Sequence, residues 1–283
     1  MKKRHDAAKA PHKDFSTLAG AARAGREDRP RGLVRWPRHD PHEDPYEREK
    51  HTMAVIHRTT MQPTKMELLG AWLPTRPWYA AGAGGPLPVR AGGFRLDDPE
   101  GEVGIEFMVV TDGTGPDAVA HHVPLTYRAH PLPGAEHALV GTSEHGVLGR
   151  RWVYDGAHDP VLAERLHALL DGRAEPQDQT ATDAPDPTVA VSPLAPDGTG
   201  ADVELVRVEE GPDHTDVVVR RPGAPAPLVL RVRRVLRADG DGGTADGGTA
   251  RVTGEWQRPD GTTARGTYAT AFTELAASTD FTA

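Results

Sequence analysis

The sequence contains no cysteine and no asparagine, and each absence excludes particular sites. Without cysteine, the chain has no disulfide, zinc thiolate site, iron–sulfur cluster or cysteine nucleophile. Without asparagine, it lacks the residue that binds a metal ion in the catalytic loop of protein kinases. Lysine is scarce: five of the six lie at or before Lys50, and the sixth, Lys65, falls in a predicted helix rather than a strand. We therefore expect no kinase activity of this type.

Apolar residues are also few. Hydrophobic residues make up 37% of the 283, aromatic residues only 5%, and 31 glycines and 26 prolines are present, so we expect a folded part well short of the whole chain. No run of about 18 apolar residues predicts a membrane span, and no apolar stretch follows the basic N-terminus as in a secretory signal. The net charge of −8 disfavours nucleic-acid binding. We expect a cytoplasmic protein.

The first 52 residues differ in composition from the rest. Residues 1–52 are rich in charge and show almost no apolar periodicity, which predicts a disordered tail. Met53 opens an apolar sequence, so two interpretations stay open: a genuine basic tail, or a mis-assigned start with the true start near Met53. After this point we expect an α+β domain over 53–175, a linker or long loop over 176–200, and a β-rich continuation or second subdomain over 201–275.

The hydrophobic pattern predicts two short helices among many strands. One helix is expected over 64–72, stopped by Pro74, and the other over 160–171, after the N-cap Asp159. Residues 80–93 and 238–250 read as loops, and Pro124 suggests an edge strand or a bulge. Strands are expected over 103–111, 121–128, 137–142, 147–155, 203–210, 216–221, 227–236, 251–257 and 264–272. The fold class is therefore α+β with a mostly antiparallel sheet.

The familiar catalytic motifs are not supported by their context. The glycine-rich stretch 82–86 has no following lysine and opens no helix, so we interpret it as a loop and not as a phosphate-binding site. Ser143 lies in a sequence that resembles a nucleophile elbow only superficially, because a strand follows where a helix is needed. Size and the missing strand–helix alternation exclude a barrel glycosidase. Pairs of carboxylates cannot be judged from sequence, so no catalytic residue is assigned.

Histidines could supply a metal site, but their spacing favours another interpretation. Adjacent residues of a strand point to opposite faces, so at most one of His121 and His122 can join a cluster. No HExxH or HxH pattern is present. We expect exposed or hydrogen-bonded strand histidines and no metal or cofactor; the residues considered are His121, His122, His137, His145 and His158.

Two stretches, 72–80 and 144–156, combine aromatic residues with arginine. Such groups could form a sugar-stacking or protein-docking surface, and they could equally belong to the core. On a strand, alternate residues from 150 to 154 share one face, so the burial of Val153 would leave Trp152 and Tyr154 exposed. The candidate ligand or partner surface consists of Trp78, Tyr79, Arg150, Trp152 and Tyr154.

These same stretches resemble a known family. Trp72-Leu73-Pro74 followed by Trp78-Tyr79-Ala80 resembles the opening motif of the N-terminal cap domain of actinobacterial maltokinases. That motif is a short helix, Leu-Pro, and then a Trp followed by an aromatic residue. The residues from Val123 to Arg128 and from Trp152 to Gly156 are similar to stand-alone cap-like proteins of actinobacteria, often labelled glucan-branching proteins by inheritance.

The resemblance covers about 53–175 and extends in weaker form over 200–275. It implies a curved antiparallel sheet with packed helices, in a context of maltose, trehalose and glycogen metabolism. Pro77 stands where maltokinases usually have a basic residue, and the kinase lobes that follow the cap are missing, so no catalytic residue is carried over. Together with the absent catalytic residues and the aromatic–arginine stretches, this resemblance leads us to expect a non-catalytic, cap-like module that binds a partner enzyme, such as a kinase or a glucan-metabolising enzyme, or an α-glucan. The alternative is a carbohydrate-active enzyme or a kinase accessory subunit.

Overall fold

The computed structural model describes residues 61–81, 88–113, 115, 118–180, 184–195, 202–240 and 248–273. The predicted tail 1–52 and the predicted start near Met53 lie outside these residues. The glycine-rich stretch 82–86 lies outside them too, as do parts of the predicted loops over 176–200 and 238–250.

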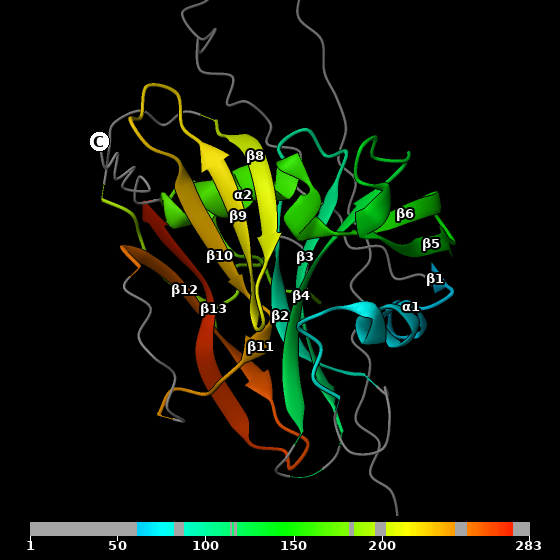
Figure 1. The fold of residues 1–283 in the computed structure, drawn as a ribbon. Coiled ribbons are helices and arrows are strands. Elements are labelled where there is room, and N and C mark those ends of the chain that lie inside the picture. Colours follow the sequence, from blue (N-terminus) through cyan, green and yellow to red (C-terminus); the bar gives the residue numbers. More distant parts are fainter. Residues whose placement is uncertain are drawn as a thin grey trace, which may run out of the picture. The chain divides into compact units, whose positions relative to one another are not determined.

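The described residues form a β-rich structure with two α-helices, which confirms the predicted α+β class with a mostly antiparallel sheet (Figure 1). The α-helices are α1 (Lys65–Trp72) and α2 (Pro160–Leu170), and three 3₁₀ turns are η1 (Leu73–Thr75), η2 (Glu136–Ala138) and η3 (Gly156–His158). The strands are β1 (Met61–Gln62), β2 (Val89–Leu96), β3 (Gly104–Asp112), β4 (Val119–Arg128), β5 (Leu139–His145), β6 (Gly149–Asp155), β7 (Ala190–Ser192), β8 (Glu204–Glu210), β9 (His214–Arg220), β10 (Leu228–Arg233), β11 (Val235–Leu236), β12 (Ala250–Gln257) and β13 (Thr263–Thr273).

All these strands belong to one sheet, in the order β1-β5-β6-β4-β3-β2-β12-β13-β10-β9-β8. β7 is added beside β12, and β11 pairs with β4. Because β11 follows β10 after a single residue, the pairing with β4 leads the chain back to the other half of the sheet. The strands from β4 through β3, β2, β12, β13 and β10 therefore close into a ring.

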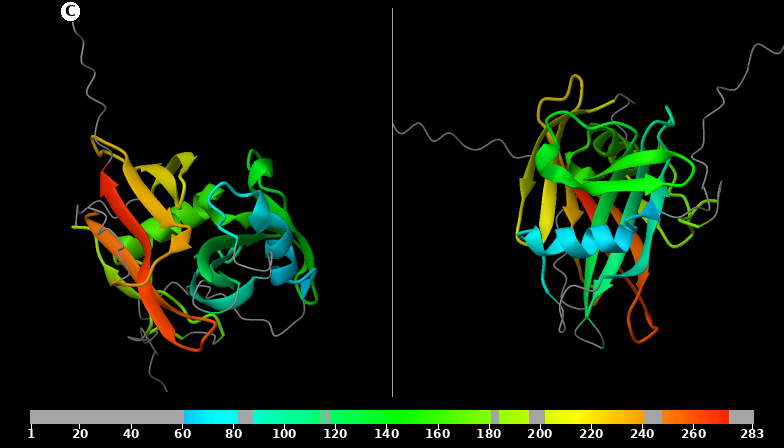
Figure 2. Two further views of the ribbon diagram at one scale, coloured as in Figure 1. Left: turned by 60° about the horizontal axis from the view of Figure 1, so that its bottom comes forward. Right: turned by 90° about the vertical axis from the view of Figure 1, so that its right-hand side faces the viewer.

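The largest hydrophobic core joins the two halves of the sheet. Phe94 and Phe107 of β2 and β3 belong to the same buried cluster as Val217 and Leu230 of β9 and β10. The apolar side of α2, including Leu166, packs into this cluster, and α2 lies beside β8 (Figure 2). Strands that follow residue 200 thus share a sheet and a core with those that precede residue 175. The domain boundaries predicted from the sequence stay predictions.

Local sequence signals explain where both helices begin. The Thr64 hydroxyl accepts a hydrogen bond from the Glu67 amide, and the Glu67 carboxylate accepts one from the Thr64 amide, so α1 begins with a capping box. At the start of α2, the Asp159 carboxylate accepts a hydrogen bond from the Val161 amide, and Pro160 occupies the first turn. Both predicted helices are found within two residues of their expected ends. In the part of the chain that the structure describes, no helix combines the length and the apolar character needed to cross a membrane.

Two sequence interpretations are corrected by the sheet. The predicted loop 80–93 ends earlier, because β2 begins at Val89 and pairs with β3 despite its two glycines. Pro124 lies neither on an edge strand nor at a register shift against β3. On its other side β4 pairs with β11 up to His121 and with β6 from Leu125 onward, so the proline falls between two partner strands. A residue without an N–H group is tolerated at that gap.

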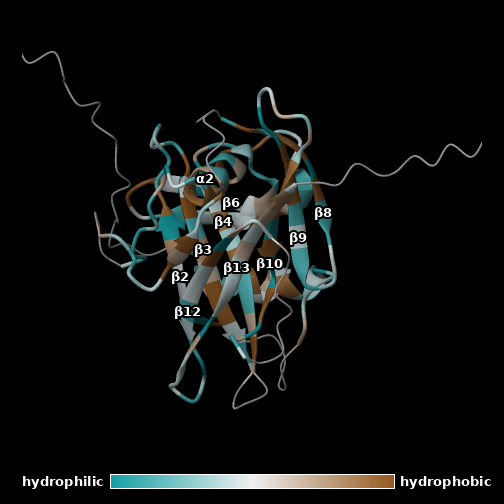
Figure 3. Cartoon of the chain, turned by 90° about the vertical axis from the view of Figure 1, so that its left-hand side faces the viewer, coloured by the Kyte–Doolittle hydropathy of each residue, from teal (hydrophilic) through white to brown (hydrophobic). Residues whose placement is uncertain are grey.

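Apolar and polar strands are distributed unevenly (Figure 3). The edge strand β8 is hydrophilic over most of its length and has exposed charges such as Glu204 and Arg207. Charged side chains on an edge strand discourage further strands from pairing there. The inner strand β3 is buried from Ile105 to Asp112.

Candidate functional site

The five residues of the predicted surface do not form one surface. Trp78 and Tyr154 are only 1% and 2% exposed, so neither ring can stack on a sugar or contact a partner. Trp78 packs at 5.8 Å, edge to face, on Trp72, and the Tyr154 hydroxyl accepts a hydrogen bond from the Leu132 amide. The predicted alternative of Val153 inside and Tyr154 outside is therefore wrong, because separate small cores cover the two faces of β6.

The other three predicted residues are more accessible, in different degrees. Trp152 is half-buried against the small core around Tyr154, and Tyr79 is half-buried, stacked on His121 and hydrogen-bonded to Asp112. The Arg150 side chain is exposed and pairs with Glu144 at 2.7 Å across the β5–β6 hairpin. Of the predicted set, Arg150 alone lies fully at the surface.

The turn of the β5–β6 hairpin presents apolar side chains that the sequence interpretation did not single out. Val147 and Leu148 are 61% and 45% exposed, one after the other in the turn. The ring nitrogen Nδ1 of His145 accepts hydrogen bonds from both of their amides, at 3.3 and 3.0 Å. The turn is thereby held in one conformation, with its apolar side chains directed to solvent.

Behind the hairpin lies a buried ion pair. Arg234, which is fully buried, separates β10 from β11, and its Nη2 donates to both carboxylate oxygens of Asp155 at 2.8 and 2.7 Å. Its Nε donates to the Thr215 hydroxyl, and its guanidinium lies 4.9 Å from the centre of the Trp78 ring. This pair links β6 to the strand that turns back toward β4. Nothing in the sequence indicated this ion pair, because Arg234 lies within a run of arginines and valines.

His121 and His122 point to opposite faces of β4, as the strand alternation predicts. His121 stacks on Tyr79, while His122 lies between Phe107 and Tyr268, and its Nδ1–H donates to the Arg233 carbonyl at 3.0 Å. Both are fully buried, and burial lowers the pKa of His121 and lowers that of His122 to about 3. The two rings are neutral packing groups.

His137 and His158 do come together. Nε2 of His137 lies 3.1 Å from Nδ1 of His158, with the rings perpendicular. Nε2 of His158 faces Glu210 at 3.9 Å. Burial lowers the pKa of His158, so its imidazole is neutral near pH 7. This pair of histidines is separated by 21 residues, and the sequence provided no means of predicting the contact.

A second buried carboxylate, that of Glu106, forms an ion pair with Lys65, the sixth lysine of the sequence. The Glu106 carboxylate on β3 accepts a hydrogen bond from the Lys65 ammonium group at 2.5 Å and another from the Tyr127 hydroxyl at 2.7 Å. Burial acts to raise the pKa of this carboxyl, but Lys65 and the hydrogen bonds outweigh it and hold the pKa low. Lys65 thus anchors α1 to the sheet. Ser143 is likewise buried and donates to the Pro63 carbonyl at 2.7 Å, so it offers no free nucleophile.

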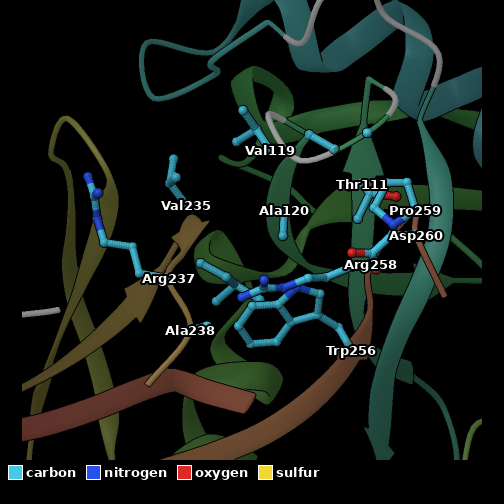
Figure 4. Close-up of a pocket in the computed structure, with 13 residues that line it drawn as sticks. Thr111, Val119, Ala120, Val235, Arg237, Ala238, Trp256, Arg258, Pro259 and Asp260 are labelled. Atoms are coloured by element: carbon cyan, nitrogen blue, oxygen red, sulfur yellow. The ribbon is translucent and has the colours of Figure 1, made fainter. Parts of the chain in front are cut away.

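A pocket of about 320 Å³ opens between β4, β11 and the β12–β13 hairpin (Figure 4). Arg237, Arg258 and Asp260 line it, with Trp256 at its base. The Trp256 ring is almost completely buried. One carboxylate oxygen of Asp260 accepts hydrogen bonds from the amide and the hydroxyl of Thr262. The pocket therefore offers cationic groups but little aromatic surface on which a sugar ring could stack.

Comparison with known proteins supports the resemblance inferred from the sequence. A search of curated proteins found no match to this chain. The model of the maltokinase N-terminal cap domain matches residues 72–159, which run from the last residue of α1 through η3. The matched part contains both stretches that resemble maltokinase caps, together with the β5–β6 hairpin and Asp155. This part of the chain is thus similar to the N-terminal cap domain of maltokinases.

Proposed function

We propose that this protein is a non-catalytic, cap-like module that binds a partner enzyme of α-glucan metabolism, a kinase or a glucan-metabolising enzyme, through the tip of the β5–β6 hairpin. The observation that carries the proposal is the exposure of Val147 and Leu148 at that tip. Exposed apolar groups beside a charged rim are typical of protein contacts. The similarity of residues 72–159 to maltokinase caps supports this class of partner.

The exposed side chains favour a protein over a glucan as the ligand. Sugar rings bind on exposed aromatic faces, and no tryptophan, tyrosine or phenylalanine is fully exposed among the residues that the structure describes. Large apolar side chains are exposed at four of the described positions, and two of these adjoin at the hairpin tip: Val89, Val147, Leu148 and Val206. The glucan alternative would have to rely on the pocket near Trp256.

Hydrogen bonds and an ion pair also hold the hairpin tip in place. The two hydrogen bonds to His145 fix the turn, and the Glu144–Arg150 pair spans the strands below it. A rigid tip loses little conformational entropy when it docks, which favours affinity. Arg150 is then placed as a polar anchor next to the apolar contact, the combination often found in residues that dominate binding.

The proposal predicts that charge at the tip abolishes partner binding. The double variant Val147→Asp/Leu148→Asp is expected to lose the partner, because carboxylates would be desolvated in the contact. Tagged full-length protein is used to capture proteins from native cytosol, and mass spectrometry identifies them. The expected result is a kinase or glucan-metabolising enzyme that the wild type retains and the double variant does not.

Val206→Asp is the matched control, because it places the same charge on an exposed valine of β8 and is expected to keep the partner. Recovery of the same enzyme with the double variant would contradict the proposal. So would recovery of no such enzyme at all. Co-sedimentation with glycogen and maltodextrin is measured in parallel, and binding there without an enzyme partner would favour the glucan alternative.

A further inference from the structure

We propose a divalent transition-metal site, of the kind that binds Zn²⁺, formed by Asp155, His158 and Glu210. One ligand atom of each lies within 4.8 Å of the others. The residues come from the end of β6, from η3 and from the end of β8, so the fold brings together positions that are more than 50 residues apart in the sequence. The site is separate from the hairpin tip and does not depend on the function proposed above.

The short 3₁₀ turn places the first two ligands on one side. Asp155 precedes η3 as its N-cap, and His158 ends it. The single turn between them brings ligand atoms of both side chains within 4.8 Å of each other. Glu210 then approaches from β8, and its carboxylate is partly exposed to solvent, which leaves a route for an ion to enter.

The distance between His158 and Glu210 fits two ligands of one ion better than a direct contact. Nε2 of His158 lies 3.9 Å from Oε1 of Glu210, which is too far for a hydrogen bond. Zinc–nitrogen and zinc–oxygen bonds are each about 2.0–2.2 Å long, so an ion can bind both atoms with little movement.

His137 contacts the ring nitrogen of His158 that does not face Glu210. Its Nε2 lies 3.1 Å from Nδ1 of His158, so when Nε2 of His158 binds the ion, Nδ1–H of His158 can donate to His137. Metal-binding histidines commonly have their second nitrogen fixed by such a hydrogen bond. His137 is therefore a positioning residue for this site and not a ligand.

The donor set and the charge select the kind of ion. One imidazole and two carboxylates suit zinc and its neighbours, whereas Mg²⁺ and Ca²⁺ prefer oxygen ligands alone. Arg234 neutralises Asp155 in part, since its Nη2 donates to both oxygens, so the ligands and this guanidinium together carry one negative charge. That charge favours a divalent cation but predicts weaker binding than at a site without the arginine.

The proposal is tested with metal ions alone on the full chain. Titration of the wild type with Zn²⁺, followed by calorimetry, and with Co²⁺, followed by visible absorption, is expected to show one equivalent that Glu210→Gln and His158→Ala both lose. Glu210→Gln is at the partly exposed end of an edge strand, so its fold is expected to survive even if His158→Ala unfolds. His137→Ala is expected to weaken binding about tenfold or more without removing the equivalent.

His130→Ala is the control, because His130 is exposed and lies outside the cluster. It is expected to bind the same number of equivalents as the wild type. Binding that is identical in the wild type, Glu210→Gln and His158→Ala would overturn the proposal and assign the metal to other histidines of the chain. Absence of any Zn²⁺ or Co²⁺ binding by the wild type would overturn it as well.

Discussion

A single residue, Arg234, lies where the chain leaves β10 and turns back toward β4. Residues 227–236 read as one strand in the sequence, but Arg234 divides them into β10, which pairs with β13, and β11, which pairs with β4. Its guanidinium is fully buried, and Asp155, Thr215 and the Trp78 ring surround it. A buried arginine is tolerated only with such partners, because the uncompensated charge would cost several kcal/mol, on the order of 3–5. The pairing of β11 with β4 is thus accompanied by a buried ion pair that joins Arg234 to β6.

His122 predicts how stability depends on pH. Its pKa of about 3 in the folded protein lies below the ordinary value of 6.5, so the unfolded chain binds one more proton between these values. Stability is then expected to fall as the pH is lowered from 6.5, by up to about 1.4 kcal/mol per pH unit from this residue. Urea unfolding between pH 6.5 and 4.5 is expected to show a flatter dependence in His122→Phe than in the wild type.

Two other histidines, His121 and His158, have pKa values shifted in the same direction, so only the difference between the variant and the wild type isolates His122. His130→Phe is the control, since this exposed side chain is not packed in the core, and its slope should equal that of the wild type. Equal slopes for His122→Phe and the wild type would show that His122 does not account for the effect.

At the scale of elements, glycine makes β2 a strand that its sequence hides. Gly93 has φ +116°, and a Cβ atom built there would lie 2.0 Å from the Phe107 carbonyl oxygen on β3. Only a residue without a side chain lets the two strands approach this closely. The two glycines of β2 lower the strand propensity of residues 89–96, and for this reason the sequence pattern predicted a loop there.

Gly93→Ala is therefore expected to be more destabilising than an ordinary replacement of a glycine with positive φ. The backbone conformation alone costs about 1–2 kcal/mol, and the clash with a main-chain oxygen adds to it. Gly134→Ala is the matched control, with φ +81° and no atom within 4 Å of the added Cβ. Urea unfolding followed by tryptophan fluorescence compares the two, and an equal loss of stability would disprove the close approach of β2 to β3.

At the scale of the whole described structure, the core makes the parts on either side of residues 176–200 interdependent. Leu162 and Leu166 of α2 belong to the same buried cluster as Val232, Val252 and Tyr268 from the later strands. The pairing between β2 and β12 is limited to Trp256 and Gly92, so the two halves of the sheet depend on this core and on β11 for their association.

A chain that ends at residue 175 is consequently expected not to fold to a native-like state. It would leave the apolar side of α2 in water, and we expect binding of a hydrophobic dye and loss of the cooperative thermal transition. A chain that ends at Thr273 keeps every described strand and is the control, expected to unfold as the full chain does. Cooperative unfolding of the shorter chain would show that the first part is an independent domain.

The sequence by itself determined the elements that rest on local signals. The Thr64 and Asp159 caps, the turn formed by Arg258–Thr262, the apolar period of α2 and the apolar run of β3 each act within a few residues. The Trp72-Leu73-Pro74 motif, also local, indicated the similarity to maltokinase caps that the match over 72–159 confirmed. Local hydrogen bonding and side-chain period are encoded in neighbouring residues, so they can be predicted without the fold.

Only the tertiary structure decided which side chains are buried and which distant groups meet. Trp78 and Tyr154 were candidates for a surface, but both are buried in small cores, whereas Val147 and Leu148 are among the exposed apolar residues. The contact between His137 and His158 depends on how η2 is placed against η3, and the approach of Glu210 to His158 depends on how β8 is placed against η3. Burial and long-range charge pairing arise from strand order and sheet closure, and no period in the sequence encodes either.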